Sequence, residues 1–578
     1  MFARWAPILL LFAAAACGPS ALRGDGGGGD DHGDGGNNGC PLTCSADNRD
    51  VVDCHGTTVQ TCTAEQACGG GVCADPCDAA AASKSSIGCD YYSVTPDVIL
   101  SNTGGCFAAF VANTWTTPVS ITVEYGGQML PVSSFGRIPS GQGQALSYAP
   151  LPNGMLAPGE VAILFLSRFG SSSSDCPAGI TPAITANNTA VHGTGRGSAF
   201  RIRTSAPTVA YDIYPFGGGS SAVTSATLLL PTSAWDTNYV AVNAYPKTTI
   251  NEGRPFVEIV AQHDATSVTL RPVVAIEAAS GVQGSPAQTP VTYTLNAGQV
   301  LQFTQAAELT GSPITSDKPI GVWGGASCLN VEVGVNACDS AHQQIPPVKA
   351  LGYRYTGVRY RNRYPGVEET VPWRIVGGVD GTQLTYSPAP PPGAPTSLSL
   401  GQVVTFSTAS PFFVHSQDAE HPFYMSSYMS GCDTYGDVGP DCRGDPEFVN
   451  VVPVEQYLPS YTFFTDPTYP ETSLVLTRER TNGTFADVAI DCVGNVTGWA
   501  PIDSAGDLEY ARVDLVTGNF ASVNGCNNGR HVATSALPFG MVVWGWGSAA
   551  SQPFNSNAVS YAYPAGASVK PINTVVIQ

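Results

Sequence analysis

The chain has few charged residues and very few lysines. Only 12% of its 578 residues are Asp, Glu, Lys or Arg, against about a quarter in an average soluble domain, and five are lysine. The net charge is −20. A nucleic-acid partner requires a basic surface that neutralises phosphates, and no basic cluster is longer than the scattered arginines of 353–363. The composition therefore argues against nucleic-acid binding.

The segment 353–363 alternates arginines with tyrosines at a period close to two. This pattern predicts a β-strand with one polar face. Stacking of its rings and guanidinium groups on sugars or nucleotides is the alternative interpretation. The arginines concerned are Arg354, Arg359, Arg361 and Arg363.

Common catalytic motifs are also missing. The sequence has no G-x-S-x-G elbow, no H-E-x-x-H pair, no P-loop and no dinucleotide fingerprint. We therefore expect a protein that is not an enzyme and that needs no cofactor. A secreted hydrolase stays open as an alternative, because a triad or a carboxylate pair can be assembled from distant residues.

The first residues predict export. Arg4 precedes an apolar run at 8–16, and small residues at 14–16 lead directly to Cys17. Residues 1–16 resemble a bacterial lipoprotein signal peptide, with lipidation of Cys17 at the start of the mature chain; an ordinary cleaved signal is the alternative. The run is too short to span a bilayer as a helix. We expect a lipid-anchored protein of the cell envelope, at the outer membrane or cell surface.

Two short segments follow the anchor. Residues 17–39 are rich in Gly and Asp with almost no apolar side chains, which predicts a flexible tether. Residues 40–77 hold seven cysteines and are too short to bury a useful core, so we expect disulfides to stabilise them. Zinc is disfavoured because matched CxxC pairs are absent. The seven are Cys40, Cys44, Cys54, Cys62, Cys68, Cys73 and Cys77.

The cysteines beyond Cys17 number sixteen, an even count that fits an oxidising compartment. Because the module holds an odd number, Cys77 is expected to pair outside it, with Cys89 as the nearest candidate. Local spacing suggests the pairs Cys328 with Cys338 and Cys432 with Cys442, which leaves Cys106 with Cys176 and Cys492 with Cys526.

Residues 78–578 predict an all-β region. Gly (64) and Pro (45) are abundant, short stretches such as 120–126 alternate apolar and polar residues, and no helical period extends over a useful length.

Landmarks recur along this region. Gly-Gln-Val occurs at 298–300 and 401–403, with a similar Gly-Glu-Val at 159–161. Three prolines have a tyrosine eight residues later. Prolines that lead into apolar strands are Pro207, Pro319, Pro411 and Pro538. We expect about four related antiparallel, sandwich-like β units in one continuous body; a large propeller-like ring is the alternative.

Several segments carry a family resemblance. SAPTVAYDIYPFGG and LLLPTSAW, within 197–240, together with 315–330, 343–347 and 560–566, resemble the N-terminal domain of IgGFc-binding proteins. The resemblance covers about 89–566. It implies binding or adhesion at a surface, with a surface protein or a polysaccharide as partner, and no catalytic residues. A structural envelope protein without a specific ligand is the alternative.

One acidic loop is a candidate calcium site. A disulfide between Cys432 and Cys442 would close it and gather hard oxygen ligands, although the spacing is not that of an EF-hand. The candidate ligands are Asp433, Asp437, Asp441 and Asp445.

Overall fold

The computed structural model describes residues 40–45, 49–99, 102–218, 221, 223–335, 338–435, 442–548 and 559–578. Its contacts separate residues 1–41 from one compact unit, 42–578, which is the body described below. The expected signal peptide, Cys17 and the tether lie outside the described residues. Among the residues described, no helix has the length and apolar character needed to cross a bilayer.

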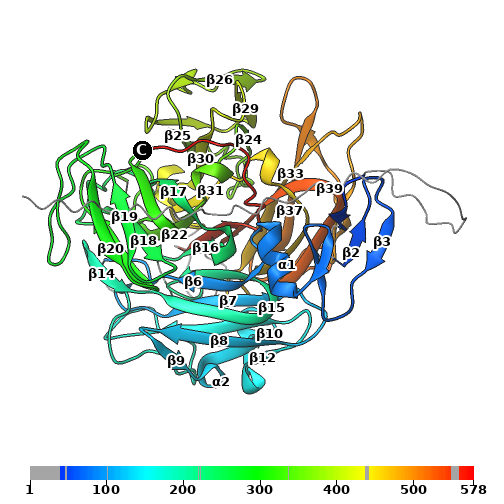
Figure 1. Cartoon of the computed structure of the whole chain (residues 1–578), viewed down its shortest axis with the longest axis horizontal. Coiled ribbons are helices and arrows are strands. Elements are labelled where there is room, and N and C mark those ends of the chain that lie inside the picture. Colours follow the sequence, from blue (N-terminus) through cyan, green and yellow to red (C-terminus); the bar gives the residue numbers. More distant parts are fainter. Residues whose placement is uncertain are drawn as a thin grey trace, which may run out of the picture. The chain divides into compact units, whose positions relative to one another are not determined.

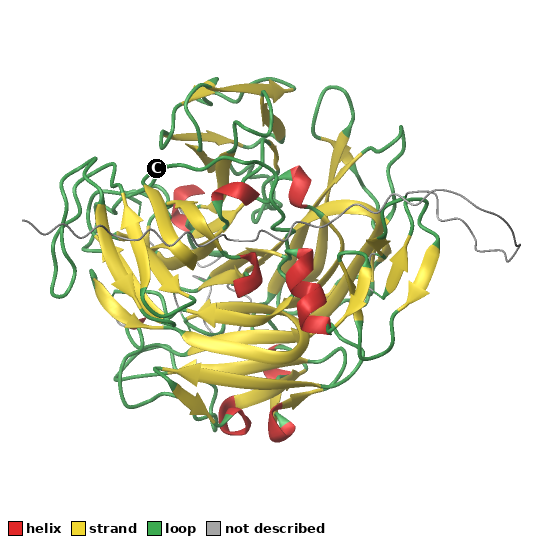
Figure 2. Ribbon diagram, in the orientation of Figure 1, coloured by secondary structure: helices red, strands yellow, loops and turns green. Residues whose placement is uncertain are grey.

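The body is all-β, as predicted (Figure 2). Strands form nearly all of it, and the ladders within its sheets are antiparallel. The helices are α1 (Pro76–Ser83), α2 (Val132–Phe135) and short 3-10 turns, among them η4 (Thr232–Ala234), η5 (Val348–Ala350), η6 (Cys432–Tyr435) and η8 (Val454–Gln456).

Four related units follow one another along the chain. The first contains β6 (Gly88–Ser93), β7 (Phe107–Asn113), β8 (Val119–Tyr125), β13 (Val161–Ser167), β15 (Phe200–Tyr214) and β16 (Ser225–Leu229). The second contains β17 (Asp236–Val240), β18 (Pro255–Ala261), β19 (Thr266–Leu270), β20 (Val291–Leu295), β21 (Gln299–Thr304), β22 (Pro313–Leu329) and β23 (Asp339–Ile345). The third contains β24 (Arg354–Gly357), β25 (Val371–Gly377), β26 (Thr382–Ser387), β28 (Val403–Thr408), β29 (Phe412–Ser416), β30 (Phe423–Met429) and β31 (Glu447–Asn450). The fourth contains β32 (Leu458–Thr465), β33 (Glu471–Glu479), β34 (Val488–Ile490), β37 (Leu508–Thr517), β39 (Gly529–Trp546) and β40 (Ser560–Pro564).

Shorter strands extend the edges of these sheets. They are β9 (Gln128–Leu130), β10 (Gly136–Ser140), β11 (Ser147–Pro150), β12 (Met155–Leu156), β14 (Gly195–Ser198), β27 (Ser397–Leu398), β35 (Gly494–Asn495), β36 (Ala500–Pro501) and β38 (Ala521–Ser522).

A long strand organises each unit. The first half of β15 pairs with β6 and β8, and its second half pairs with β7 and β16. The first half of β22 pairs with β17 and β19, and its second half pairs with β18 and β23. The first half of β39 pairs with β32 and β34, and its second half pairs with β33 and β40. In the third unit two strands, β29 and β30, share the role.

The last strand of each unit lies at the centre of the body. We call β16, β23, β31 and β40 the inner strands. They contact one another in cyclic order, β16 with β23, β23 with β31, β31 with β40, and β40 with β16. The units surround them as cyan, green, yellow-green and orange groups (Figure 1). The predicted tandem β units are thus present in one continuous body, and they also close into a ring.

The hydrophobic cores lie between neighbouring units. One cluster joins the first and second units through residues such as Phe107 and Trp323, and others join the second with the third, the third with the fourth, and the fourth with the first. Trp544 and Trp546 are buried in the cluster between the third and fourth units. Since each core needs two units, the ring is stabilised as a whole.

One sequence landmark was assigned to the wrong residue. Pro207, Pro319 and Pro538 lie inside β15, β22 and β39, between the two halves of each strand. Pro411 instead precedes β29, and Pro422, directly before β30, occupies the equivalent place. The reason is that the turn at 417–422 splits the long strand of the third unit, so that a second proline-led strand appears upstream.

The cysteine-rich module consists of short strands: β1 (Thr43–Cys44), β2 (Asp50–Val52), β3 (Thr58–Thr61), β4 (Ala67–Gly69) and β5 (Val72–Ala74). Within it Cys44 is joined to Cys68 and Cys62 to Cys73. Cys77, in α1, is joined to Cys89 in β6, which ties the module to the first unit. Cys40 and Cys54 are also disulfide-bonded. The remaining pairs are Cys106–Cys176, Cys328–Cys338, Cys432–Cys442 and Cys492–Cys526.

Candidate binding face

The connections from each long strand to its inner strand begin and end at one end of the ring, because the units are equivalent and these strands pair in antiparallel fashion. Their described residues are 215–218, 221, 223–224, 330–335, 338, 430–435, 442–446, 547–548 and 559. We call this end the loop face. Disulfides close two of its connections at corresponding places, Cys328–Cys338 and Cys432–Cys442. In each pair the cysteines are ten positions apart in the sequence. Loops held on a rigid scaffold are the usual carriers of binding function.

Polar residues begin all four inner strands at the loop face: Ser225, Asp339, Glu447 and Ser560. Two hydrogen bonds connect these residues, or residues next to them, between different units. The Ser225 hydroxyl donates to Glu447 Oε1 at 2.9 Å, and the Ser560 hydroxyl donates to the Asp445 carbonyl at 2.7 Å. The floor of the loop face is therefore a polar cluster contributed by every unit.

The carboxyl groups of this floor are buried. Asp339 and Glu447 are 0% exposed and Asp445 is 4% exposed. Burial raises the pKa of Asp339 well above its ordinary value, and the nearby charges of Asp445 and Glu447 raise it further. Burial also raises the pKa of Glu447 well above its ordinary range. Because burial disfavours the charged form of a carboxyl group, these covered acids do not offer charge to a ligand outside.

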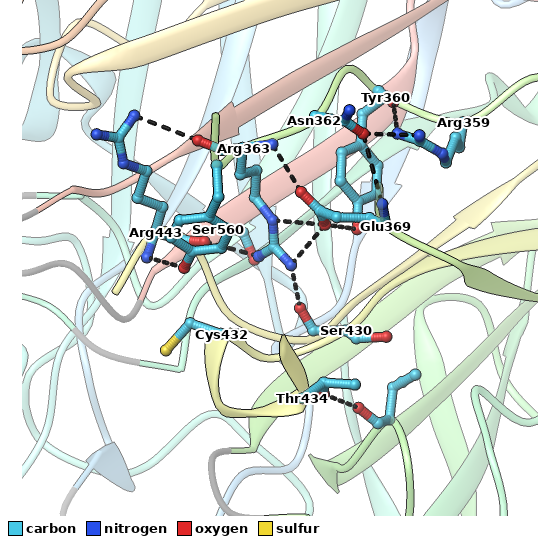
Figure 3. Close-up of polar contacts among 12 residues, drawn as sticks. Arg359, Tyr360, Asn362, Arg363, Glu369, Ser430, Cys432, Thr434, Arg443 and Ser560 are labelled. Atoms are coloured by element: carbon cyan, nitrogen blue, oxygen red, sulfur yellow. Dashed lines mark hydrogen bonds and ion pairs between the residues drawn. The ribbon is translucent and has the colours of Figure 1, made fainter. Parts of the chain in front are cut away.

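Arg363 fixes the base of the third connection (Figure 3). Its buried guanidinium forms an ion pair with Glu369 at 2.9 Å, and both side chains are fully covered. It also donates to the carbonyls of Ser430 and Arg443 at 2.8 and 2.7 Å. These two carbonyls lie on opposite sides of the Cys432–Cys442 disulfide, so one cation holds both ends of the loop.

The arginine-rich segment is therefore not the predicted strand. Only Arg354–Gly357 form β24, and the chain beyond is irregular. Arg359 donates to the Tyr360 carbonyl and the Asn362 amide oxygen. The segment turns inward because its guanidinium groups satisfy buried carbonyls and carboxylates.

Arg361 reaches from the same segment into the fourth unit. It donates to Glu471 at 2.7 Å and to Asp514 at 2.6 Å, and its guanidinium lies 4.7 Å from the ring of Trp546. Arg443 forms a second ion pair with Glu471 at 3.3 Å. The partners are more than 100 residues from Arg361 in the chain, so no local pattern indicated them.

The four candidate calcium ligands are placed unequally. Asp437 and Asp441 lie outside the described residues. Asp433 belongs to η6, and its side chain is not described. Asp445 is buried beside Asp339 at the centre of the ring. Calcium binding by this loop stays a prediction.

Two further groups of side chains among the described residues have metal-ligand chemistry. The first is Cys40, Cys54 and His55, in which both cysteines are disulfide-bonded. The second lies in the fourth unit. Asp491, Cys492 and His531 bring ligand atoms within 4.8 Å of one another. Cys492 is bonded to Cys526, however, and a disulfide sulfur is not the thiolate that binds metals. The His531 ring instead bonds the Asp491 carboxylate at 3.0 Å and the Asn527 carbonyl at 2.7 Å, which is a structural role.

Fold and site together define a disulfide-bonded ring of β units that presents loops from one end. The family model of IgGFc-binding protein matches residues 225–545, from β16 into β39 and more than half of the chain. The chain belongs to the IgGFc-binding protein family, as its segments predicted.

A curated relative supports this membership. The human IgGFc-binding protein is 24% identical over 328 residues, which cover 55% of this chain and 5% of the relative. The chain therefore corresponds to a small part of that protein's length.

Proposed function

We propose that this protein is an exported, lipid-anchored binding protein that attaches to another protein or to a polysaccharide at a surface. The observation that carries the proposal is family membership combined with the loop face, where the described ends of four equivalent connections lie together and two connections are closed by disulfides. The family's name refers to binding, and the name of the human relative refers to the Fc part of IgG. For this chain we propose a surface partner without naming Fc.

Burial of the acidic groups supports binding over hydrolysis. A hydrolase needs its acid and base side chains within hydrogen-bond reach of substrate. Asp339 and Glu447, the carboxyl groups at the floor of the loop face, are fully covered. They are therefore out of reach of a substrate, whereas a partner protein or polysaccharide needs only the surface of the loop face.

The anchor and tether favour contact between surfaces. A lipid on Cys17 and the Gly/Asp-rich residues 17–39 would hold many copies at the envelope with freedom to reorient. Several weak contacts made at once can exceed the affinity of each one by orders of magnitude. A structural envelope protein would share the anchor but would not need a partner.

Adhesion of cells tests the proposal. Cells that display the full chain are compared with cells that display only residues 1–39 fused to an unrelated domain, on surfaces coated with partner cells or their extracellular polymer. We expect adhesion with the full chain alone. Equal adhesion in both arms would overturn the binding function and favour the structural alternative.

The calcium prediction is tested in the same assay. Asp437→Ala with Asp441→Ala removes two candidate ligands, and each strain is measured with and without a chelator. If calcium orders the loop, chelator lowers adhesion of the wild type and has no further effect on the variant. Asp487→Ala with Asp503→Ala, outside this loop, is the matched control. Adhesion that neither chelator nor the variant changes would remove calcium from the proposal.

A further inference from the structure

A cavity of about 430 Å³ lies on the second unit, over the part of its sheet formed by β17, β22 and β19. Pockets that bind small molecules usually measure about 300–1,000 Å³. Lys349, on its wall, belongs to η5, which follows the carboxyl end of β23, whereas the loop face lies at the amino end of that strand. The cavity is therefore separate from the loop face.

Arg271 is the distinctive residue of this cavity. Its backbone N–H donates to the Pro313 carbonyl at 3.0 Å, which places it at the end of β19 against β22. The side chain is half-buried, and its buried Nε has no hydrogen-bond partner within the described part of the chain. No carboxylate pairs with it there either. In a chain with a net charge of −20, an uncompensated arginine on a cavity wall is a binding group rather than a stabilising one.

The second cation of the cavity is already neutralised. Lys349 Nζ lies 3.4 Å from the Asp236 carboxylate. Arg271 is therefore the cationic side chain of the wall that has no carboxylate partner within the described residues, and its planar guanidinium fits a carboxylate with two parallel hydrogen bonds.

Hydroxyl side chains lie beside Arg271. Thr269 lies directly opposite Thr315 in a ladder of β22. Asn238 lies opposite Thr315 on the other side, but it is buried and its side-chain amide is bonded to the backbone of Ile577. The Thr269 hydroxyl also bonds the Thr292 hydroxyl of β20 at 2.8 Å. Thr237 and Ser316 complete the polar wall. Side-chain hydroxyls that can both donate and accept suit a ligand with many hydroxyls of its own.

We propose that this cavity binds a saccharide that carries a carboxylate, such as a uronic acid unit. Arg271 donates to the carboxylate, and the hydroxyls of Thr269 and Thr315 meet the sugar hydroxyls. A protein partner fits less well, because protein interfaces are anchored by aromatic and large apolar side chains, and none of the described residues that line this cavity is aromatic. The inference goes beyond the proposed function, since the loop face can bind a partner whether or not this cavity is used.

The test measures binding of a glucuronate-containing disaccharide to the purified full-length protein by titration calorimetry. Four ligand–protein combinations are compared: wild type and Arg271→Gln, each with the acidic disaccharide and with the same disaccharide after reduction of its carboxylate to an alcohol. Arg254→Gln, an exposed arginine of the same unit that lies 3.9 Å from Glu277, is the matched control.

Loss of a charge-assisted pair should weaken binding on the order of tenfold to a hundredfold. We expect this loss of affinity when Arg271→Gln binds the acidic disaccharide, and an equal loss when the wild type binds the reduced one. Combining both changes should weaken binding little further. Arg254→Gln should bind the acidic disaccharide with wild-type affinity. The reduced ligand tests the wild-type protein directly, so the result does not depend on the folding of a variant. Equal affinity for both disaccharides would overturn the proposal. So would tighter binding of a short glutamate peptide that displaces the disaccharide, because the ligand would then be protein.

Discussion

The Tyr91 hydroxyl donates a 2.6 Å hydrogen bond to the carbonyl of Thr208, the residue that follows Pro207 in the long strand of the first unit. The same relationship recurs in the other units: Tyr239 with Ile320 at 2.7 Å, Tyr355 with Phe423 at 2.6 Å, and Tyr461 with Phe539. Each acceptor directly follows a proline, which is Pro422 in the third unit. This contact marks the internal repeat more securely than any proline alone.

These tyrosine contacts should be worth measurable stability in every unit. In the second, third and fourth units the phenol also accepts a backbone N–H from three residues earlier, for example Asp236 to Tyr239 at 3.1 Å. Replacement of Tyr239 or Tyr355 by Phe leaves a buried carbonyl and a buried N–H unsatisfied, so we expect a loss of about 1–3 kcal/mol in the free energy of unfolding. Denaturant titration measures it. Tyr353→Phe is the control, because the Tyr353 hydroxyl makes no hydrogen bond within the described residues. An equal loss of stability in Tyr353→Phe would contradict the explanation.

Arg363 and Glu369 should behave as a coupled buried pair. Arg363→Met leaves the Glu369 carboxylate buried without its cation, and we expect a loss of about 3–5 kcal/mol. Adding Glu369→Gln removes the unpaired buried charge, so the double variant should be more stable than Arg363→Met alone. The exposed pair of Arg480 and Asp507 provides the comparison, where Arg480→Met should cost less than about 1 kcal/mol. A double variant no more stable than the single one would refute the coupling.

Asp466 should make stability depend on pH. Burial raises the pKa of Asp466 from 3.8 to about 6, only partly offset by hydrogen bonds from Thr468. Between these two values the folded state binds a proton that the unfolded state does not, so stability falls as pH rises from about 4 to 6. Asp466→Asn removes the titrating carboxyl group and with it this pH dependence of stability.

The expected result is a gain in relative stability of Asp466→Asn by up to about 3 kcal/mol as pH rises from 4 to 7. Unfolding midpoints at each pH measure it, and the exposed Asp78→Asn serves as control. A constant difference between variant and wild type across this range would show that Asp466 is not the titrating group.

Lipidation of Cys17 is the prediction on which the proposed anchoring depends. We expect the mature N-terminus to be Cys17 with a diacylglycerol thioether and the protein to fractionate with membranes. Cys17→Ala should release it into the soluble fraction. Mass spectrometry of the purified N-terminus decides the point, and an unmodified Cys17 or a different first residue would contradict it.

Local sequence was enough wherever the stabilising contacts are local. Gly298 and Gly401 have φ of 72° and 73°, which favours glycine, and each precedes a strand at the same place in its unit. The side chain of Gln299 accepts from the Asn296 N–H at 3.2 Å, and that of Gln402 from the Ser399 N–H at 3.0 Å. Because these turns close within four residues, the Gly-Gln-Val landmark could be recognised from sequence alone. The abundance of such turns also determined the all-β class.

Tertiary structure alone decided which polar residues are buried and what they contact. Asp339 and Glu447 are 108 positions apart by subtraction of their numbers and meet only because four inner strands close a ring. Arg361 donates to Asp514, which lies 153 residues later in the chain. Because this partner is so distant, a segment whose pattern predicted the polar face of a strand makes interior contacts instead. The Arg271 side chain, conversely, gains no hydrogen bond at its buried Nε and no ion pair within the described residues, which is what the proposed saccharide site depends on. Burial and charge pairing depend on partners remote in sequence, so periodicity could not report them.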